Sequence, residues 1–205
     1  MATIVALGDS TTAGTPGFQS PVEAPPDGAG NVESQFAYWL MQAHPDWRVL
    51  NRGVNGERAD EIGARFARDV AAARPDVVVI IAGVNDVYQG RNADAVQRDL
   101  AAIYAAARAA KIPTVAGSII PYNTATAAQN QAMRAVNGWI REQADAHAES
   151  MVFCDTRAAV AEPGAPDRLV SSPDDLHPSP DGYKLMAAAL DPAIVAALAM
   201  ARALG

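Results

Sequence analysis

The chain has 205 residues, of which 50% are hydrophobic and 19% are charged, a composition typical of a soluble globular protein. This length suffices for one domain with a substantial core and is short for two, so we expect a single domain over residues 1–205. The net charge of −7 disfavours nucleic-acid and anionic-membrane partners, which usually require a basic patch. A small-molecule or glycan substrate is therefore expected.

Cys154 is the only cysteine, which excludes an intramolecular disulfide, and its apolar neighbours predict a buried side chain. The first predicted strand begins almost at Met1, which leaves no room for a signal segment. The cytoplasm is therefore the expected location, and secretion is expected only if a leader has been removed. The apolar stretch 187–204 is interrupted by an Asp-Pro pair and by Arg202, which predicts helices packed on a sheet and not a membrane span.

Short β-prone runs alternate along the chain with helical patterns. The predicted strands are 3–7, 48–51, 76–82, 112–120 and 151–154, and the predicted helices are 33–43, 58–73, 93–110, 126–148, 180–190 and 193–203. Residues 77–81 are all apolar, as expected of a strand buried on both faces. In the helix predicted at 58–73, Ile62, Phe66 and Val70 recur every four residues and predict a stripe that faces the sheet. Ser179 and Pro180 mark the start of the next-to-last helix.

This alternation predicts an α/β fold with a parallel sheet covered on both faces, a three-layer α/β/α sandwich. With five strands we expect the flavodoxin-like, doubly wound order 2-1-3-4-5. That order places the carboxyl ends of the first and third strands side by side, at the point where such sheets bind ligands. Ser10 follows the first strand and Asn85 follows the third.

Residues 11–31 interrupt the compact pattern. These 21 residues include four prolines and four glycines and show no periodicity. A loop of this length inside a compact domain is usually functional or disordered. Because it starts directly after Ser10 and its prolines limit backbone freedom, we expect an ordered or semi-ordered loop beside the active site that helps to select the substrate.

Four short blocks of polar residues follow predicted strands or lie near the C-terminus. They are Gly8-Asp9-Ser10, the segment 51–56, the segment 83–86 and the pair Asp174 and His177. Each block alone has a structural explanation: a tight turn, glycines with positive φ, a helix cap and a solvated loop. Together they supply a hydroxyl nucleophile, donors for an oxyanion, a base and a carboxylate to orient that base.

In this order the four blocks resemble those of the SGNH hydrolases, also called the GDSL hydrolase family, and the resemblance covers nearly the whole chain. It implies a fold of the SGNH hydrolase type with Ser10 as nucleophile. His177 corresponds to the base and Asp174 to its orienting carboxylate, while Gly56 and Asn85 correspond to the oxyanion donors, together with the backbone N–H of Ser10.

The sequence departs from the family pattern at two positions. Thr11 stands where the family usually has leucine, and Val84 stands where it usually has a second glycine. The first departure concerns packing beside the nucleophile, and the second leaves Asn85 in register. Gly56 is preferred to Gly53 as oxyanion donor because it occupies the later position in its block.

The expected chemistry is acyl transfer. His177 takes the proton of Ser10 as its oxygen attacks an acyl carbon, and then returns the proton to the leaving alcohol. Asp174 is preferred to Asp175 as the orienting group because a spacing of three residues in a tight turn brings the carboxylate and the ring together. This chemistry needs no metal and no cofactor.

The sequence therefore predicts a serine esterase that hydrolyses a small acyl or acetyl ester, including esters of carbohydrates, through an acyl-enzyme. Tyr122, which follows the fourth strand, and Thr11 are expected to line the substrate pocket. Thioesterase and lysophospholipase activities of the same family stay open, as does the oligomeric state. A competing interpretation is a flavodoxin-like module that binds phosphate or FMN through the hydroxyl-rich segment 10–15, but such a module does not need Asn85 or His177.

Overall fold

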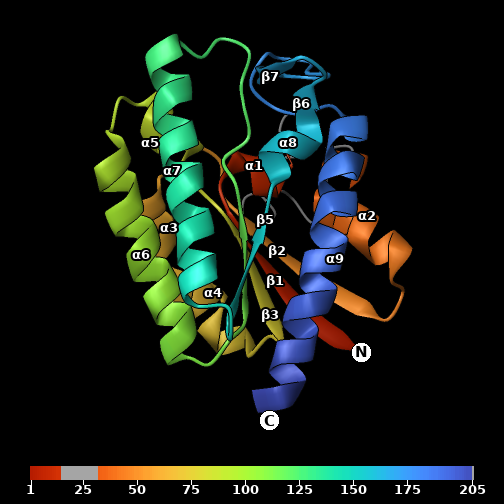
Figure 1. The fold of residues 1–205 in the computed structure, drawn as a ribbon. Coiled ribbons are helices and arrows are strands. Elements are labelled where there is room, and N and C mark those ends of the chain that lie inside the picture. The colour runs from red at the N-terminus through yellow and green to blue at the C-terminus, as the bar shows by residue number, and fades with distance from the viewer. Residues whose placement is uncertain (15–31, 205) are drawn as a thin grey trace.

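The computed structural model describes residues 1–14 and 32–204 (Figure 1). Its central sheet has five parallel strands in the order β2-β1-β3-β4-β5, which confirms the predicted doubly wound topology. The strands are β1 (Ala2–Gly8), β2 (Trp47–Gly53), β3 (Val77–Ile81), β4 (Thr114–Gly117) and β5 (Met151–Cys154). Their carboxyl ends meet at one edge of the sheet.

Successive side chains of the central strands enter two separate hydrophobic clusters, because side chains alternate between the faces of a sheet. On β1, Val5 and Leu7 belong to one cluster, while Ile4 and Ala6 belong to the other. Residues 77–81 of β3 alternate in the same way and are at most 3% exposed. The continuous apolar run therefore reflects a strand covered by helices on both sides.

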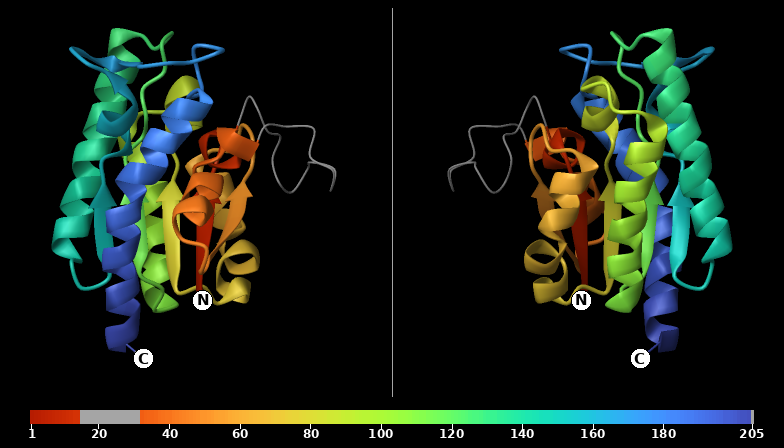
Figure 2. Two further views of the ribbon diagram at one scale, coloured as in Figure 1. Left: turned by 90° about the vertical axis from the view of Figure 1, so that its right-hand side faces the viewer. Right: turned by 90° about the vertical axis from the view of Figure 1, so that its left-hand side faces the viewer.

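Helices cover both faces of the sheet, as Figures 1 and 2 show. The face of Val5 and Leu7 is covered by α3 (Ala59–Ala64), α4 (Phe66–Asp69), α5 (Val84–Tyr88), α6 (Ala93–Ala109) and α7 (Ala127–Ala146). The opposite face is covered by α2 (Phe36–Ala43) and α9 (Pro180–Leu204). The three-layer sandwich is thus confirmed.

Several short elements were not predicted, and they cluster at the carboxyl edge of the sheet. They are α1 (Ser10–Ala13), α5, α8 (Thr156–Val160) and an antiparallel hairpin of β6 (Ala161–Glu162) and β7 (Ala165–Leu169). Two 3-10 turns, η1 (Val32–Ser34) and η2 (Ala71–Ala73), complete the described elements. Figure 1 shows α1, α5, α8 and the hairpin at one end of the sandwich. Elements of four or five residues leave no periodic pattern in a sequence, which explains why they were missed.

The strand predicted at 112–120 is too long, since β4 ends at Gly117. Beyond it, the side chain of Asn137 on α7 satisfies both backbone groups of Ile119. The Ile119 N–H donates to Asn137 Oδ1 at 2.7 Å, and Asn137 Nδ2 donates to the Ile119 carbonyl at 2.9 Å. This side chain takes the place of a neighbouring strand, so the apolar residues after Gly117 are buried without being in the sheet.

The helix predicted at 58–73 is three separate pieces, α3, α4 and η2, although its stripe of Ile62, Phe66 and Val70 is buried as expected. The helical geometry breaks at Arg65 (φ −100°, ψ 5°) and again at Val70 (φ −112°, ψ −63°). At the first break the Arg65 guanidinium binds two carbonyls at the ends of neighbouring strands. The segment thus stays in contact with the edge of the sheet and does not form one continuous helix.

The two helices predicted at 180–190 and 193–203 form one continuous helix, α9, with Pro192 inside it. Proline disfavours a helix interior because it lacks an N–H and clashes with the preceding turn. Here Leu190 and Ile194, on either side of the proline, are both fully buried in the same cluster, so packing on the sheet holds the two halves together. Ser179 caps the start as predicted, accepting a hydrogen bond from the Gly182 N–H at 3.3 Å.

Among the described helices, α9 alone is long and apolar enough to cross a bilayer, over Pro180–Arg202 with a mean hydropathy of 1.6. In the structure it lies on the sheet. Tyr183, Met186, Leu190 and Ile194 are all fully buried in the cluster that also contains β1 and β3 residues. The apolar composition of α9 is thus explained by its contact with the sheet.

The loop predicted at 11–31 begins differently from the expectation. Residues 11–13 belong to α1, and Gly14 ends this helix with φ 100°. The remaining residues of the predicted loop, 15–31, lie outside the described residues, so its expected role in substrate selection stays a prediction.

Candidate active site

Ser10 is the first residue of α1, directly after the turn that ends β1. Asp9 caps this helix by accepting the Thr11 N–H at 2.9 Å. The turn is so tight that a Cβ on Gly8 would lie 2.2 Å from Thr12 Oγ1 and 2.3 Å from the Ile81 carbonyl oxygen. Glycine is therefore required before the Asp-Ser pair, and the turn presents Ser10 at the carboxyl edge of the sheet.

The structure brings Ser10, His177 and Asp174 together in a hydrogen-bonded chain. Ser10 Oγ lies 2.8 Å from His177 Nε2, and His177 Nδ1 lies 2.7 Å from Asp174 Oδ2. Ser10 and His177 are 7% and 6% exposed in the described structure. With Nδ1–H donating to the carboxylate, Nε2 is left as an acceptor for the Ser10 hydroxyl.

Asp174 and Ser172 fix the loop that carries the histidine. Asp174 Oδ1 accepts the backbone N–H groups of His177 at 2.8 Å and Leu176 at 3.1 Å, and Ser172 Oγ donates to the His177 carbonyl at 2.7 Å. Partial burial raises the pKa of Asp174, but the hydrogen bonds from His177 and Leu176 outweigh it and hold this pKa below its usual value. The carboxylate therefore stays ionised beside the imidazole.

Asp175 points away from the imidazole, to the segment after β4. Asn123 donates to it twice, from its backbone N–H to the Asp175 carbonyl at 2.7 Å and from Nδ2 to Asp175 Oδ1 at 3.0 Å. Asn123 Oδ1 also accepts the Leu169 N–H at 2.9 Å. Asp175 has φ 63°, a conformation that aspartate tolerates better than most residues. Asn123 thus fastens the histidine loop to β7 and to the end of β4.

The segments after β2 and β3 place Gly56 and Asn85 at the same edge of the sheet as Ser10, since β2 and β3 both pair with β1. Gly56 has φ 80°, and a Cβ there would meet nothing within 4 Å, so glycine is required for its conformation and not for space. Asn85 lies on α5, and its Nδ2 donates to the carbonyl of Glu57 at 2.9 Å. This bond joins the residue next to Gly56 to the Asn85 amide.

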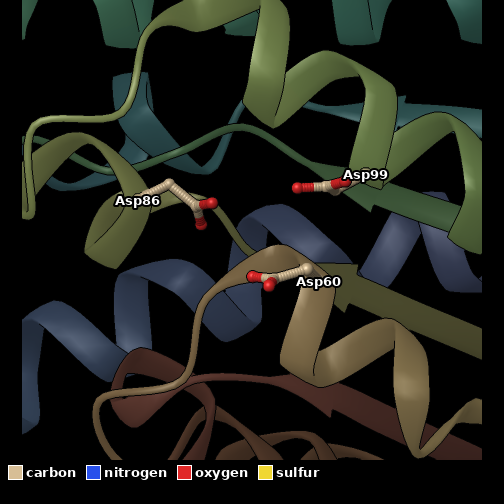
Figure 3. Close-up of side chains that lie close together, drawn as sticks. All are labelled: Asp60, Asp86 and Asp99. Carbon is tan, nitrogen blue, oxygen red and sulfur yellow. The ribbon is translucent and has the colours of Figure 1, made fainter.

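Next to Asn85, the fully buried Asp86 ties α5 to the start of α3 by accepting the Ala59 N–H at 2.9 Å. Figure 3 shows Asp86 with Asp60 and Asp99, whose carboxylates point toward one another and lie within 4.8 Å of each other. Arg91 donates to all three, at 2.5 Å to Asp86, 3.1 Å to Asp60 and 2.6 Å to Asp99. The guanidinium of Arg91 therefore offsets part of the negative charge of the group, and Arg58 also pairs with Asp60 at 3.1 Å, so we identify the group as an ion network.

Asp9 is fully buried beside the nucleophile. Burial raises the pKa of its carboxyl to about 7, against the hydrogen bond from Thr11 and the charge of Arg65, which lower it. Among the described residues, Asp9 Oδ2 has no hydrogen-bond partner. The cap of α1 is thus a carboxyl group that burial keeps partly protonated near neutral pH.

The two predicted substrate-binding residues are almost fully buried. Thr11 is 2% exposed within α1, and Tyr122 is 1% exposed, with its ring 5.8 Å from that of Tyr88. The Tyr122 hydroxyl has no hydrogen-bond partner among the described residues. Their contact with a substrate stays a prediction.

Sequence reasoning did not predict the supporting residues Arg65, Glu57 and Ser172, and it considered Asn123 only as a residue that lines the pocket, together with Pro121 and Tyr122. Only Arg65 left a signal: it lies three residues after Ile62 and one before Phe66, on the side of the helix pattern predicted to be buried. A charged residue at such a position needs partners inside the protein. Asn123 lies in a loop whose partners Asp175 and Leu169 are distant in the sequence, and Glu57 and Ser172 lie in loops that show no periodic pattern.

A serine, a histidine and an aspartate in one hydrogen-bonded chain, at the carboxyl edge of a doubly wound sheet, form the arrangement found in serine hydrolases. The chain belongs to the GDSL-like Lipase/Acylhydrolase family, which matches residues 6–185. The resemblance stated from the four sequence blocks is thereby confirmed.

Known relatives agree with this assignment. An acetylxylan esterase from Geobacillus stearothermophilus is 35% identical over 75 residues, which cover 32% of this chain and 34% of that enzyme, so the match spans about a third of the relative's length. The crystal structure of an acetylxylan esterase from the same organism has a TM-score of 0.70 at 24% identity, covering 92% of both chains. A carbohydrate acetylesterase family member from Sinorhizobium meliloti has a TM-score of 0.74 at 17% identity, covering 97% of this chain and all of that one. These structural matches support the fold.

Proposed function

We propose that this protein is a serine esterase that hydrolyses short acyl esters, with Ser10 as nucleophile, His177 as general base and Asp174 as its orienting carboxylate. The observation that carries the proposal is the hydrogen-bonded chain from Ser10 Oγ through His177 to Asp174, with links of 2.8 Å and 2.7 Å. A hydroxyl is a weak nucleophile unless a base accepts its proton, and this geometry supplies the base. The family assignment supports the same chemistry.

The reaction follows from this chain of bonds. His177 Nε2 accepts the Ser10 proton as Oγ attacks the acyl carbon, and the imidazolium then protonates the leaving alcohol. A water molecule then attacks the acyl carbon of the acyl-enzyme, and His177 Nε2 accepts its proton. His177 returns this proton to Ser10 Oγ as the bond from Oγ to the acyl carbon breaks, which releases the acid and restores the Ser10 hydroxyl. Asp174, whose pKa is held below its usual value by its bonds to His177 despite partial burial, stabilises the imidazolium in both steps.

The oxyanion that forms on attack needs donors at the edge of the sheet. We assign this role to the backbone N–H groups of Ser10 and Gly56 and to the side-chain amide of Asn85. An amide nitrogen carries two hydrogens. In Asn85 one of them binds the Glu57 carbonyl and fixes the side chain, which leaves the other for the oxyanion.

We propose an acetyl ester of a carbohydrate as the substrate class to test first. The named activity of the Geobacillus stearothermophilus relative supports this choice. Thr11 and Tyr122 are retained as substrate contacts. Thr11 follows the nucleophile, and the Tyr122 hydroxyl, which is buried and has no hydrogen-bond partner within residues 1–14 and 32–204, belongs to the segment that Asn123 joins to the histidine loop.

The test compares wild-type protein with Ser10→Ala and with the control Ser150→Ala. Ser150 directly precedes β5, so it lies at the edge of the sheet opposite to the carboxyl edge that carries Ser10. Substrates are acetyl and longer-chain p-nitrophenyl esters, acetylated xylo-oligosaccharides, an acyl thioester and a lysophospholipid. We expect acetyl-ester hydrolysis in wild type and Ser150→Ala, none in Ser10→Ala, and labelling of Ser10 by an organophosphorus reagent. Full activity in Ser10→Ala, or a label on Cys154 only, contradicts the mechanism.

We further propose that the protein acts in the cytoplasm on a small-molecule ester, without a nucleic-acid or membrane partner. The net charge of −7 and the single cysteine, which allows no intramolecular disulfide, support this proposal. Fractionation of cells that produce the native gene product, with immunodetection in each fraction, tests the location.

A further inference from the structure

Arg65, at the junction of α3 and α4, is 7% exposed and binds four acceptors. Its Nη2 donates to the Gly8 carbonyl at 2.8 Å, and its Nη1 donates to the Arg52 carbonyl at 2.7 Å and to Asp69 Oδ2 at 2.8 Å. Its Nε donates to Glu57 Oε2 at 2.6 Å. Since a guanidinium has five N–H donors, these bonds use most of its capacity.

Three of the four acceptors belong to the segments that carry the proposed oxyanion donors, and the fourth, Asp69, lies on α4. Gly8 is the last residue of β1 and is followed by Asp9 and Ser10. Arg52 lies at the end of β2, before the turn that contains Gly56. Glu57 directly follows Gly56, and its carbonyl accepts the Asn85 amide at 2.9 Å. Each proposed donor is thus separated from Arg65 by a short piece of chain or one further hydrogen bond.

Resting on the serine-esterase function proposed above, we infer that Arg65 is the positioning residue of the oxyanion hole, which holds the segments of Ser10, Gly56 and Asn85 in register. It touches neither the reacting atoms nor the substrate. It acts by fixing where the donors lie before the substrate arrives, and such preorganised donors are a main source of catalysis in acyl transfer.

The geometry requires arginine. The planar fork of the guanidinium reaches acceptors in several directions at once, whereas a lysine ammonium is a compact group at the end of a flexible stem. The charge of Arg65 is balanced by Glu57 and Asp69, whose side chains are 23% and 8% exposed. A lysine at this position keeps the positive charge beside Glu57 and Asp69 but cannot bind all four acceptors. Arg65→Lys therefore tests the positioning of the segments while the charge is unchanged.

The matched control is Arg157, which is also 7% exposed. It donates to Asn130 Oδ1 at 3.0 Å and to Asp167 Oδ1 at 2.7 Å, away from β1, β2 and α5. Both Arg→Lys changes remove a buried guanidinium and are expected to lower the melting temperature. Only Arg65→Lys is expected to alter the oxyanion segments.

The experiment measures kcat and KM for an acetyl ester in wild type, Arg65→Lys, Arg157→Lys and Ser10→Ala, at a temperature where circular dichroism shows each protein folded. We expect Arg65→Lys to lower kcat by about 10- to 100-fold with KM within about twofold, because small misplacement of catalytic groups has effects of this size. Arg157→Lys retains the wild-type kcat. Equal losses of kcat in the two lysine variants, or wild-type kcat in Arg65→Lys, overturn the inference.

Hydrogen exchange followed by mass spectrometry supplies a readout that does not depend on activity. In Arg65→Lys the backbone amides of peptides covering 8–14 and 53–57 are expected to exchange at least about threefold faster than in Arg157→Lys, because their anchoring bonds are lost. If exchange is unchanged, the inference is wrong even where kcat falls. If wild type hydrolyses no ester, the proposed function fails, and the amide exchange rates alone test whether Arg65 holds these segments.

Should Arg65→Lys not fold, Glu57→Gln replaces it, because this change weakens the bond to Arg65 Nε. Glu57→Gln is expected to lower kcat and to speed amide exchange, both to a smaller extent.

Discussion

The Asp174 carboxylate binds His177 at two points, with Oδ2 on the ring Nδ1 at 2.7 Å and Oδ1 on the backbone N–H at 2.8 Å. A single side chain thereby orients the imidazole and also closes the loop that carries it. Its neighbour Asp175 makes neither contact and binds Asn123 instead. Two adjacent aspartates therefore have separable roles, which allows a controlled test.

Asp174→Asn is expected to lower kcat about 1,000- to 10,000-fold with little effect on folding. The amide occupies the same space but favours the wrong imidazole tautomer, the effect known for the corresponding change in serine proteases. Asp175→Asn keeps an oxygen for Asn123 Nδ2 and tolerates the φ of 63°, so it is expected to retain the wild-type kcat within about threefold. Steady-state kinetics of both variants checks the assignment. Comparable losses would show that the proposed role of Asp174 is wrong.

Asn85→Ala is expected to lower kcat by about 100- to 1,000-fold with KM nearly unchanged, since an oxyanion donor acts in the transition state only. Asn92→Ala serves as control: Asn92 caps α6 by accepting the Ala95 N–H at 2.9 Å, so its loss destabilises by about 1 kcal/mol and leaves kcat unchanged. Kinetics and urea unfolding of both variants separate the effects. A change confined to KM would instead make Asn85 a ground-state binding residue.

The sheet was predictable because its strands are buried on both faces and alternate with helices. β3, for example, consists of five consecutive apolar residues, and helical connections between successive strands imply a parallel sheet. The positions of Ser10 and Asn85 at one edge follow from the strand order alone. What the sequence does not contain is the set of long-range partners. Asn137 ends β4 early, and Arg65 interrupts the predicted helix, and both do so through side-chain contacts with segments distant in the sequence. Local periodicity does not identify such partners, and for Arg65 it indicates only that a charged side chain lies on the buried side of the predicted helix.

Gly53→Ala tests the contact between β2 and the helix that carries the nucleophile. A Cβ on Gly53 would lie 2.1 Å from the backbone nitrogen of Ala13, in α1, and a backbone atom there has little room to move. We expect a loss of about 3 kcal/mol in the free energy of unfolding, together with lower kcat as α1 shifts.

The matched change is Gly138→Ala on the exposed side of α7, where a Cβ meets nothing within 4 Å. It is expected to stabilise by about 0.5–1 kcal/mol, as alanine does in a helix interior. Urea unfolding at constant m-value measures both.

The buried carboxyl of Asp9 predicts a stability that depends on pH. Burial raises the pKa of Asp9 from 3.8 to about 7, so the folded protein binds this proton more tightly than the unfolded chain does. By linkage, the contribution of Asp9 to the free energy of unfolding falls as the pH rises from about 4 to about 7 and is constant outside that window. Asp9→Asn keeps Oδ1 as acceptor for the Thr11 N–H and cannot ionise.

Asp9→Asn is therefore expected to melt at a temperature that rises relative to wild type as the pH increases from 4 to 8. Most of the change is expected below pH 7, because in that range the Asp9 carboxyl is ionised in the unfolded chain and still protonated in the folded protein. Thermal unfolding in buffers of equal ionic strength measures the difference at each pH. Asp145→Asn, at an exposed position near the end of α7, is the control against which the pH dependence of Asp9→Asn is judged. A pH-independent difference between Asp9→Asn and wild type would mean that Asp9 ionises as readily in the folded protein as in the unfolded chain. Its role would then be limited to the hydrogen bond that caps α1.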